Sequence, residues 1–247
     1  KVREERIWAE YMGEKGGCQS RLRWHCHFIQ KLEDEPEIEH QNINKAYDGL
    51  REESFNSEYY EAWLNGQTGY PIIDACMRAL NDGGWINFRM RAMLVSFTSY
   101  HLWLHWKKPA IELARLFTDY EPGIHYSQIQ MQAGVTGMNT VRIYSPIKQV
   151  TDQDPQGIFI KSYLPELNSV PDHHLAEPHK MTQLEQSMYG CVIGKNYPQP
   201  IVNHAEAYKT ARDRIHSIKK LKSTKEESKK VFLKHGSRKS NRRPVRA

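Results

Sequence analysis

Helical spacing of apolar residues recurs along this chain, whereas convincing alternation of apolar and polar residues, typical of half-buried strands, does not. The clearest case is the segment 71–84, where Pro71 suits a first helical turn and Gly83-Gly84 can end the helix. Its apolar residues fall on one side of a helix: Ile72, Ile73, Cys76, Met77 and Leu80. Since the chain has 247 residues and no internal repeat, this pattern predicts one large all-α domain.

Other segments carry helical signals of different strength. Residues 87–106 form the longest candidate and are nearly apolar all round, so we expect a helix buried on several sides. The remaining predicted helices are 21–32, 57–64, one starting at Pro109, 154–164 and 203–221. In the first of these, Leu22, Cys26 and Ile29 should face inward. Ser57 caps the second, and Asn203 with Glu206 starts the last. Residues 34–54 are acidic and irregular, which predicts a surface connection, and the amide-rich segment 125–140 predicts a short helix and a loop lining a cavity.

Basic residues gather at the C-terminal end. Residues 219–247 hold twelve Lys and Arg against Glu226 and Glu227, a net charge of +10, within a chain of net charge +6. We therefore divide the chain into a helical domain, 1–221, and a basic tail, 222–247, with a short helix followed by disorder. Such a tail is suited to contact nucleic acid, although a solvated terminus explains it equally well.

Several classes of protein do not match the composition. The most apolar stretch, 92–106, is too short and too polar to cross a membrane. The four cysteines form neither a paired metal-binding motif nor a disulfide framework, so we expect reduced thiols, no metal and a cytoplasmic location. The chain lacks an initiating Met, which indicates a fragment.

Two arginines stand in the first turn of the most apolar predicted helix. Arg89 and Arg91 oppose the helix dipole there, and guanidinium groups near a core need anionic partners. Asp119 and Glu121, in the loop after the next predicted helix, are the natural candidates. From the residues alone, an ordinary ion pair joining two helices explains this arrangement best, and His125 is most simply a loop histidine.

Several collinear motifs make the chain recognisable. They are Thr68-Gly69-Tyr70-Pro71-Ile72-Ile73-Asp74-Ala75-Cys76-Met77-Arg78, Gly84-Trp85, Arg89-Met90-Arg91, Arg142-Ile143-Tyr144-Ser145-Pro146, Leu164-Pro165-Glu166-Leu167 and Tyr197-Pro198-Gln199-Pro200-Ile201-Val202. From about Cys18 to about His216, the sequence resembles the flavin-binding helical domain of the DNA photolyase and cryptochrome family.

This resemblance implies an all-α domain that holds folded-back FAD below a cavity facing damaged DNA. Arg91 and Asp119 correspond to the ion pair beside the isoalloxazine, and His125 to the residue that faces flavin N5. The remaining cofactor-binding positions implied are His25, in place of an arginine near the adenine, Trp85 and Phe88 close to the cofactor, and Glu121 at the flavin edge.

On the DNA side, the resemblance implies that Trp24 packs against a flipped lesion, with Met131 in place of a second tryptophan. Arg142 corresponds to a phosphate contact, and Arg21 stands where repair enzymes carry a glutamate. Of three tryptophans that relay electrons in many members, Trp106 alone has its counterpart here, the other positions being Ile129 and Glu53.

Family members normally begin with an α/β antenna domain and a Ser/Thr-rich segment that grips the FAD diphosphate, and this sequence contains neither. We therefore expect either the C-terminal half of a longer protein or a short relative. The first functional hypothesis is light-driven repair of a pyrimidine dimer or related lesion. A cryptochrome-type photoreceptor without repair activity comes second, and a flavin-free nucleic-acid-binding remnant third.

Overall fold

Helices account for the regular structure of residues 22–236, the part of the chain that the computed structural model describes. Residues 22–34 form a first helix. The labelled α-helices are α2 (Ser57–Leu64), α3 (Pro71–Gly83), α4 (Phe88–Ser96), α5 (Lys107–Leu116), α6 (Pro122–Ala133), α7 (Pro146–Gln153), α8 (Ile158–Tyr163), α9 (Gln183–Met188), α10 (His204–Lys220) and α11 (Lys222–His235). Within these residues the only β-type pairing is an isolated bridge between Ile193 and Tyr197, so the all-α prediction is confirmed.

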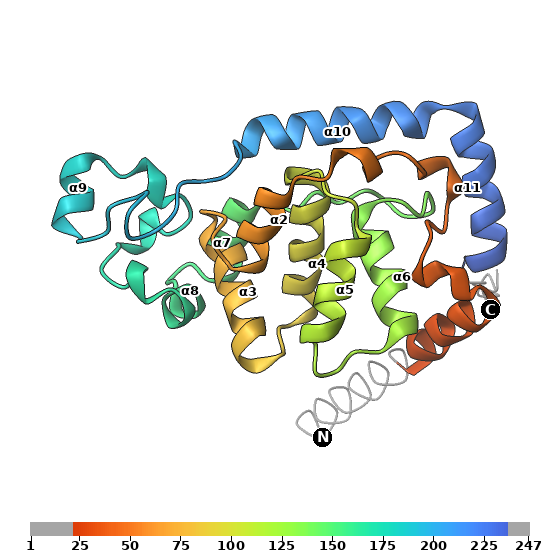
Figure 1. The fold of residues 1–247 in the computed structure, drawn as a ribbon, viewed down its shortest axis with the longest axis horizontal. Helices are drawn as coiled ribbons and strands as arrows, with labels where there is room; N and C mark the ends of the chain where they lie inside the picture. The colour runs from red at the N-terminus through yellow and green to blue at the C-terminus, as the bar shows by residue number, and fades with distance from the viewer. Residues whose placement is uncertain (1–21, 237–247) are drawn as a thin grey trace, which may run out of the picture.

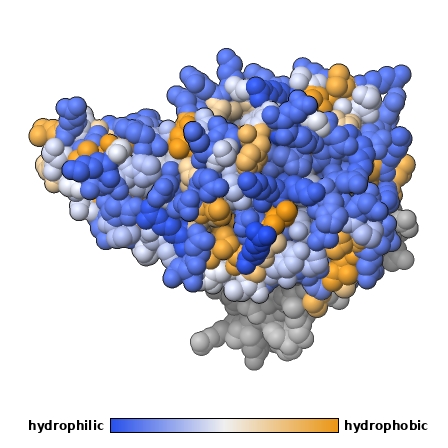
Figure 2. Space-filling view, viewed as in Figure 1, coloured by the Kyte–Doolittle hydropathy of each residue, from blue (hydrophilic) through white to orange (hydrophobic). Residues whose placement is uncertain are grey.

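The central helices stand side by side. Figure 1 shows α2 to α6 in the middle, α10 running across the top and α11 turning down at the right. The segment containing α8 and α9 forms a lobe at the left, and Leu184 and Met188 on α9 are exposed. Figure 2 shows that most of this face is hydrophilic, with apolar patches between the polar side chains.

Local signals set several helix ends where the sequence predicts them. α3 begins at Pro71 and ends at Gly84, whose φ of 68° suits a residue without a Cβ. α10 starts after Asn203, whose side chain accepts hydrogen bonds from the backbone N–H groups of Ala205 and Glu206. The cap of α2 is Asn56 rather than the expected Ser57.

A buried carboxylate fixes the turn before α3. Asp74 is fully buried, and its oxygens accept hydrogen bonds from Thr68, Gly69 and the Tyr197 hydroxyl. The Asp74 carboxylate thus joins the turn before α3 to Tyr197, which lies in the segment before α10, 123 residues further along the chain.

The prediction of one helix over 87–106 is wrong. α4 ends at Ser96 and passes into a π-helical turn, Phe97–His101. Trp103 then has a φ of 52°, an unusual left-handed value for a bulky residue. An apolar run does not reveal this break, because every residue in it can also continue an α-helix.

The connection 34–54 is not merely a surface segment. It forms three short 3-10 helices, η1 (Pro36–Glu39), η2 (Lys45–Tyr47) and η3 (Glu52–Ser54). The Gln130 side chain on α6 exchanges hydrogen bonds with the backbone of Ile38, Gln41 and Ile43, and so ties the connection to the core.

The first helix also buries a different face from the one that the sequence predicts. Leu22 and Cys26, predicted to lie inward, are exposed, whereas Lys31 is 6% exposed. The residues that decide this orientation come from distant helices, so the local pattern does not contain the information.

The C-terminal basic segment is folded as far as the structure describes it. α11 has 14 residues and packs on α10 and η2 through the buried Val231. At its end, Glu35 accepts hydrogen bonds from Lys234 and His235. α11 lies where the sequence predicts a short helix in the tail, and the expected disorder after Gly236 lies outside the described residues. No helix among residues 22–236 is long and apolar enough to cross a membrane.

Candidate functional site

A cavity of about 920 Å³ opens between the first helix, the start of α4, α6 and the end of α11. One wall is a helical stripe on the first helix: Trp24, His27, Phe28 and Lys31. The facing wall has the same spacing on α6: Ile124, Ser127, Gln128 and Met131. Pockets of this size commonly hold cofactors.

The two helices approach closely at one point. A Cβ on Gly123, in the first turn of α6, would lie 2.8 Å from the carbonyl oxygen of Phe28. A glycine there lets the backbones meet, so the two walls of the cavity are joined at this crossing.

An ion pair stands at the edge of the cavity. Arg91 Nη1 and Nη2 donate to Asp119 Oδ1 and Oδ2 at 2.9 and 3.0 Å, and Arg91 Nε donates to the Ile86 carbonyl at 2.8 Å. The guanidinium also lies 4.2 Å from the centre of the Phe117 ring. The expected contact between Arg91 and Asp119 is confirmed, and its bidentate form fixes the orientation of both groups.

Glu121 and His125 line a smaller adjoining pocket of about 150 Å³, which shares Phe88, Arg91 and Asp119 with the large cavity. Glu121 is the N-cap of α6, and its oxygens accept from the backbone N–H groups of Gly123 and Ile124. Its carboxylate therefore shapes the pocket while stabilising the helix that forms the wall.

His125 is a buried, neutral imidazole. Its Nε2 donates to the Ala110 carbonyl at 2.9 Å, which leaves Nδ1 as the acceptor of the ring. Burial lowers the pKa of His125 to about 4, and the neighbouring Arg91 acts in the same direction.

This low pKa predicts an acid sensitivity that His125→Asn should reduce. A histidine whose pKa is depressed by folding contributes stability above its unfolded pKa of about 6.5, and this stability is lost as pH falls towards the folded value. Between pH 7 and pH 4, the free energy of unfolding of the native chain should fall by about 3 kcal/mol more than that of the variant. Urea unfolding at a series of pH values measures this difference, and equal losses in both proteins would contradict it.

Most of the residues predicted for lesion and cofactor binding also line the large cavity. Trp24 and His25 come from the first helix, Met131 from α6, Trp85 from the connection before α4, and Phe88 from the start of α4. Trp24, Trp85 and Phe88 are about half exposed, at 49%, 58% and 58%. Exposed aromatic side chains at one cavity are suited to stack on planar rings. Arg21 lies outside the described residues.

Two buried polar atoms of α6 have no hydrogen-bond partner among the described residues. They are Ser127 Oγ and Gln128 Oε1, and both residues line the large cavity. Buried polar atoms are normally paired, so these two indicate a polar ligand in the cavity. A flavin, with its ring nitrogens and carbonyl oxygens, fits this combination of unpaired atoms, aromatic walls and an ion pair.

Trp106 is fully buried and lines neither pocket. Its indole N–H donates to Asn42 at 2.6 Å, and its ring lies 6.4 Å from that of Tyr126. The Tyr126 ring in turn lies 5.1 Å from the His125 ring. A chain of aromatic contacts thus leads from Trp106 to the smaller pocket.

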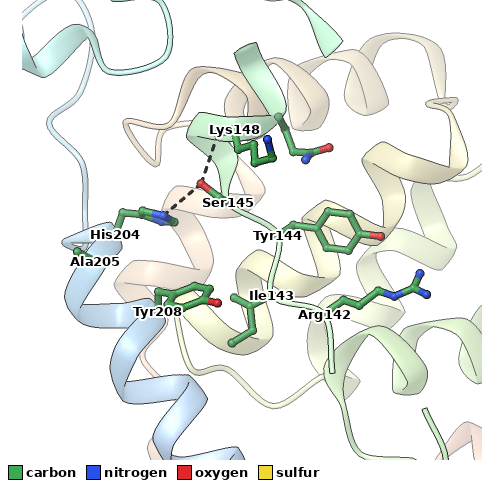
Figure 3. A pocket seen from close by; sticks show the side chains of 9 residues that line it. Arg142, Ile143, Tyr144, Ser145, Lys148, His204, Ala205 and Tyr208 are labelled. Carbon is green, nitrogen blue, oxygen red and sulfur yellow. Dashed lines mark hydrogen bonds between the residues drawn. The ribbon is translucent and has the colours of Figure 1, made fainter. Parts of the chain in front are cut away.

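Arg142 is not at the cavity. It lines a separate groove of about 660 Å³ between α7 and α10 (Figure 3). There the Ser145 hydroxyl caps α7 and contacts His204 Nε2. His204 Nδ1 lies 3.0 Å from His101 Nε2. Arg142 therefore lies apart from the cavity lined by Trp24 and Met131, the other residues that the sequence predicts on the DNA side.

The sequence interpretation missed the contributions of Lys31, Ser127 and Gln128 to the cavity. Spacings of three, four and seven residues from Trp24 and from Ile124 contain this information. These spacings identify the three residues only when one knows which residue of each helix faces the cavity.

Comparison with known proteins gives matches to this sequence and to this fold. Residues 18–217 match the family described as the FAD binding domain of DNA photolyase. A deoxyribodipyrimidine photo-lyase of Alkalihalophilus pseudofirmus is 37% identical over 180 residues, 72% of this chain and 37% of that protein. A cryptochrome DASH of Gloeobacter violaceus is 35% identical over 147 residues, 59% of this chain and 29% of that protein.

Among solved structures, a bacterial class III photolyase from Agrobacterium tumefaciens has a TM-score of 0.75 and 28% identity, covering 82% of this chain and 42% of that one. An archaeal photolyase from Sulfolobus tokodaii, solved with two FAD molecules, has a TM-score of 0.71 and 30% identity, covering 80% and 43%. The chain spans about two fifths of the length of these two structures and of the photo-lyase.

Proposed function

This chain belongs to the family of FAD-binding domains of DNA photolyase, and we propose that it binds FAD in the large cavity and acts in blue-light-driven repair of pyrimidine lesions. One observation carries the proposal: the Arg91–Asp119 pair stands at the edge of a cavity whose inner wall has unpaired polar atoms. An ordinary ion pair between helices needs neither the cavity nor the unpaired atoms.

When bound and reduced, FAD supplies a light-driven electron to a damaged base. Arg91 would place a fixed positive charge at the flavin ring, and Asp119 holds that guanidinium in one orientation through two hydrogen bonds. His125, neutral above about pH 4, offers a hydrogen-bond acceptor at Nδ1 rather than a second positive charge. The indole of Trp85, in the connection before α4, and the ring of Phe88, at the start of α4, would cover the cofactor.

The lesion would enter between the facing walls of the cavity. Trp24 on the first helix is half exposed, and its ring stacks on Phe28 at 5.8 Å, which supports a flat surface for an extruded base. Met131 supplies a flexible apolar contact from α6. Lysines of α10 and α11 would bind the DNA backbone beyond the cavity in a salt-dependent way.

A photoreceptor role is the second candidate, because α11 contributes Phe232 and His235 to the cavity. A change in the charge of a ligand in that cavity would act directly on the end of α11, which Glu35 holds. This role predicts a light-dependent change in α11 without any repair.

The test is a repair assay with purified chain, FAD and a reductant, on DNA that contains cyclobutane dimers or (6-4) lesions. The proposal predicts a bound flavin and loss of one lesion class under blue light but not in the dark. Flavin binding without repair, together with light-dependent proteolysis of α11, would select the photoreceptor. A colourless protein that binds DNA but does not bind FAD would be the flavin-free remnant. This result would overturn both the repair function and the photoreceptor role.

A further inference from the structure

One ammonium group in the large cavity has no assigned partner. Lys31 lines the cavity, 6% exposed, and no described residue accepts a hydrogen bond from its Nζ. Burial of the side chain penalises its charged ammonium group, so a lysine that faces a cavity without a described partner indicates either a nearby carboxylate or an anionic ligand.

A structural carboxylate accounts for only part of it. Glu35 is the acidic group that interacts with Lys31, but its Oε2 already accepts from Lys234 Nζ at 2.7 Å and from His235 Nε2. Burial lowers the pKa of Lys31 to about 8 in spite of Glu35, so the carboxylate offsets only part of the cost.

The described lining of the cavity also carries more positive than negative charge. It holds two permanent cations, Lys31 and Arg91, and one carboxylate, that of Asp119. Asp119 is engaged by Arg91 through both oxygens. The charge that remains unmatched is that of Lys31, with His27 and His235 beside it on the same lining.

Lys31 lies away from the residues that stack on planar rings. It follows Trp24 by seven residues, about 10 Å along a helix. The end of α11 closes this part of the cavity with His235 and Gly236. The position therefore suits a group that is charged and compact rather than flat and aromatic.

We infer that Lys31, with the imidazole of His27, forms a phosphate subsite of the cavity. A phosphate gives the ammonium group several strong acceptor oxygens and offsets the excess positive charge of the lining. Two sources share this chemistry, the diphosphate of a flavin dinucleotide and the backbone phosphate of DNA. The first source rests on the proposed function, whereas affinity for an inorganic phosphate does not.

The direct test is calorimetric binding of inorganic pyrophosphate to the native chain and to Lys31→Met, which keeps most of the side-chain volume. Lys225→Met, at an exposed position on α11, is the matched control. We expect pyrophosphate to bind the native chain and the control equally, and the Lys31 variant at least about tenfold more weakly. Absence of binding to the native chain, or equal binding to all three proteins, would overturn the subsite.

Two further arms identify the source of the phosphate. If it is the cofactor, Lys31→Met should lose affinity for FAD but keep its affinity for riboflavin, which has the same ring and no phosphate. If it is DNA, the variant should lose affinity for an undamaged oligonucleotide while its preference for FAD over riboflavin is unchanged. Either result supports the subsite, and unchanged affinities in both arms would contradict it. Failure of all proteins to bind any flavin would reject the proposed function alone.

Discussion

Replacing Arg91 by leucine should weaken FAD binding at least about 30-fold, which corresponds to about 2 kcal/mol, the usual scale for a lost hydrogen bond to a charged group. The change removes the guanidinium that would lie beside the flavin ring. It also leaves Asp119, whose side chain is half exposed, as an unpaired negative charge at the cavity. Equilibrium dialysis, with flavin absorbance as the readout, measures the effect.

Arg89→Leu is the matched control, because Arg89 lies two residues earlier on the same helix and is exposed outside the cavity. It should bind FAD as the native chain does. Circular dichroism of both variants checks that the helices remain folded. If Arg91→Leu keeps native affinity while its fold is intact, the ion pair is structural and the cofactor site lies elsewhere.

The contact between Arg91 and Asp119 shows what a sequence can predict about such a site. Two cations in the first turn of an apolar helix require acceptors, and Asp119 is one of two acidic residues in the next loop. Charge alone does not decide between Asp119 and Glu121. The structure decides, because Glu121 begins α6 and its carboxylate caps that helix.

Replacing Trp106 by phenylalanine should slow photoreduction of bound flavin at least about tenfold, a barrier increase of about 1.4 kcal/mol. The indole lies 6.4 Å from Tyr126, and Tyr126 lies 5.1 Å from His125 at the smaller pocket. Phenylalanine keeps the packing but is much harder to oxidise, so it breaks the path. Loss of the oxidised flavin absorbance under blue light, with an external reductant, gives the rate.

Trp63→Phe is the control, since Trp63 is equally buried and lines neither pocket. Trp103→Phe is a second control. The Trp103 ring lies 4.6 Å from the guanidinium of Arg51 and 4.9 Å from that of Arg214, and two neighbouring cations disfavour loss of an electron. Both controls should photoreduce at the native rate. A slow Trp103 variant together with a native rate for Trp106→Phe would move the path to Trp103.

The elements that the sequence predicts poorly are those shaped by distant contacts. α3 is readable because its proline, apolar stripe and terminal glycine act locally. The turn after Ser96 packs on α10, and the buried side of 34–54 depends on Gln130, so each has a partner far away in the chain. The cavity depends on both kinds of information. The residues of each helix that line it follow from local spacing, whereas the position of α11 at its end depends on distant contacts.

The most direct test of the account is a crystal structure of the chain grown with FAD. The account predicts the isoalloxazine beside Arg91 and Asp119, with Ser127 or Gln128 hydrogen-bonded to the cofactor. A flavin ring bound away from that ion pair, or density for FAD outside the cavity, would contradict it.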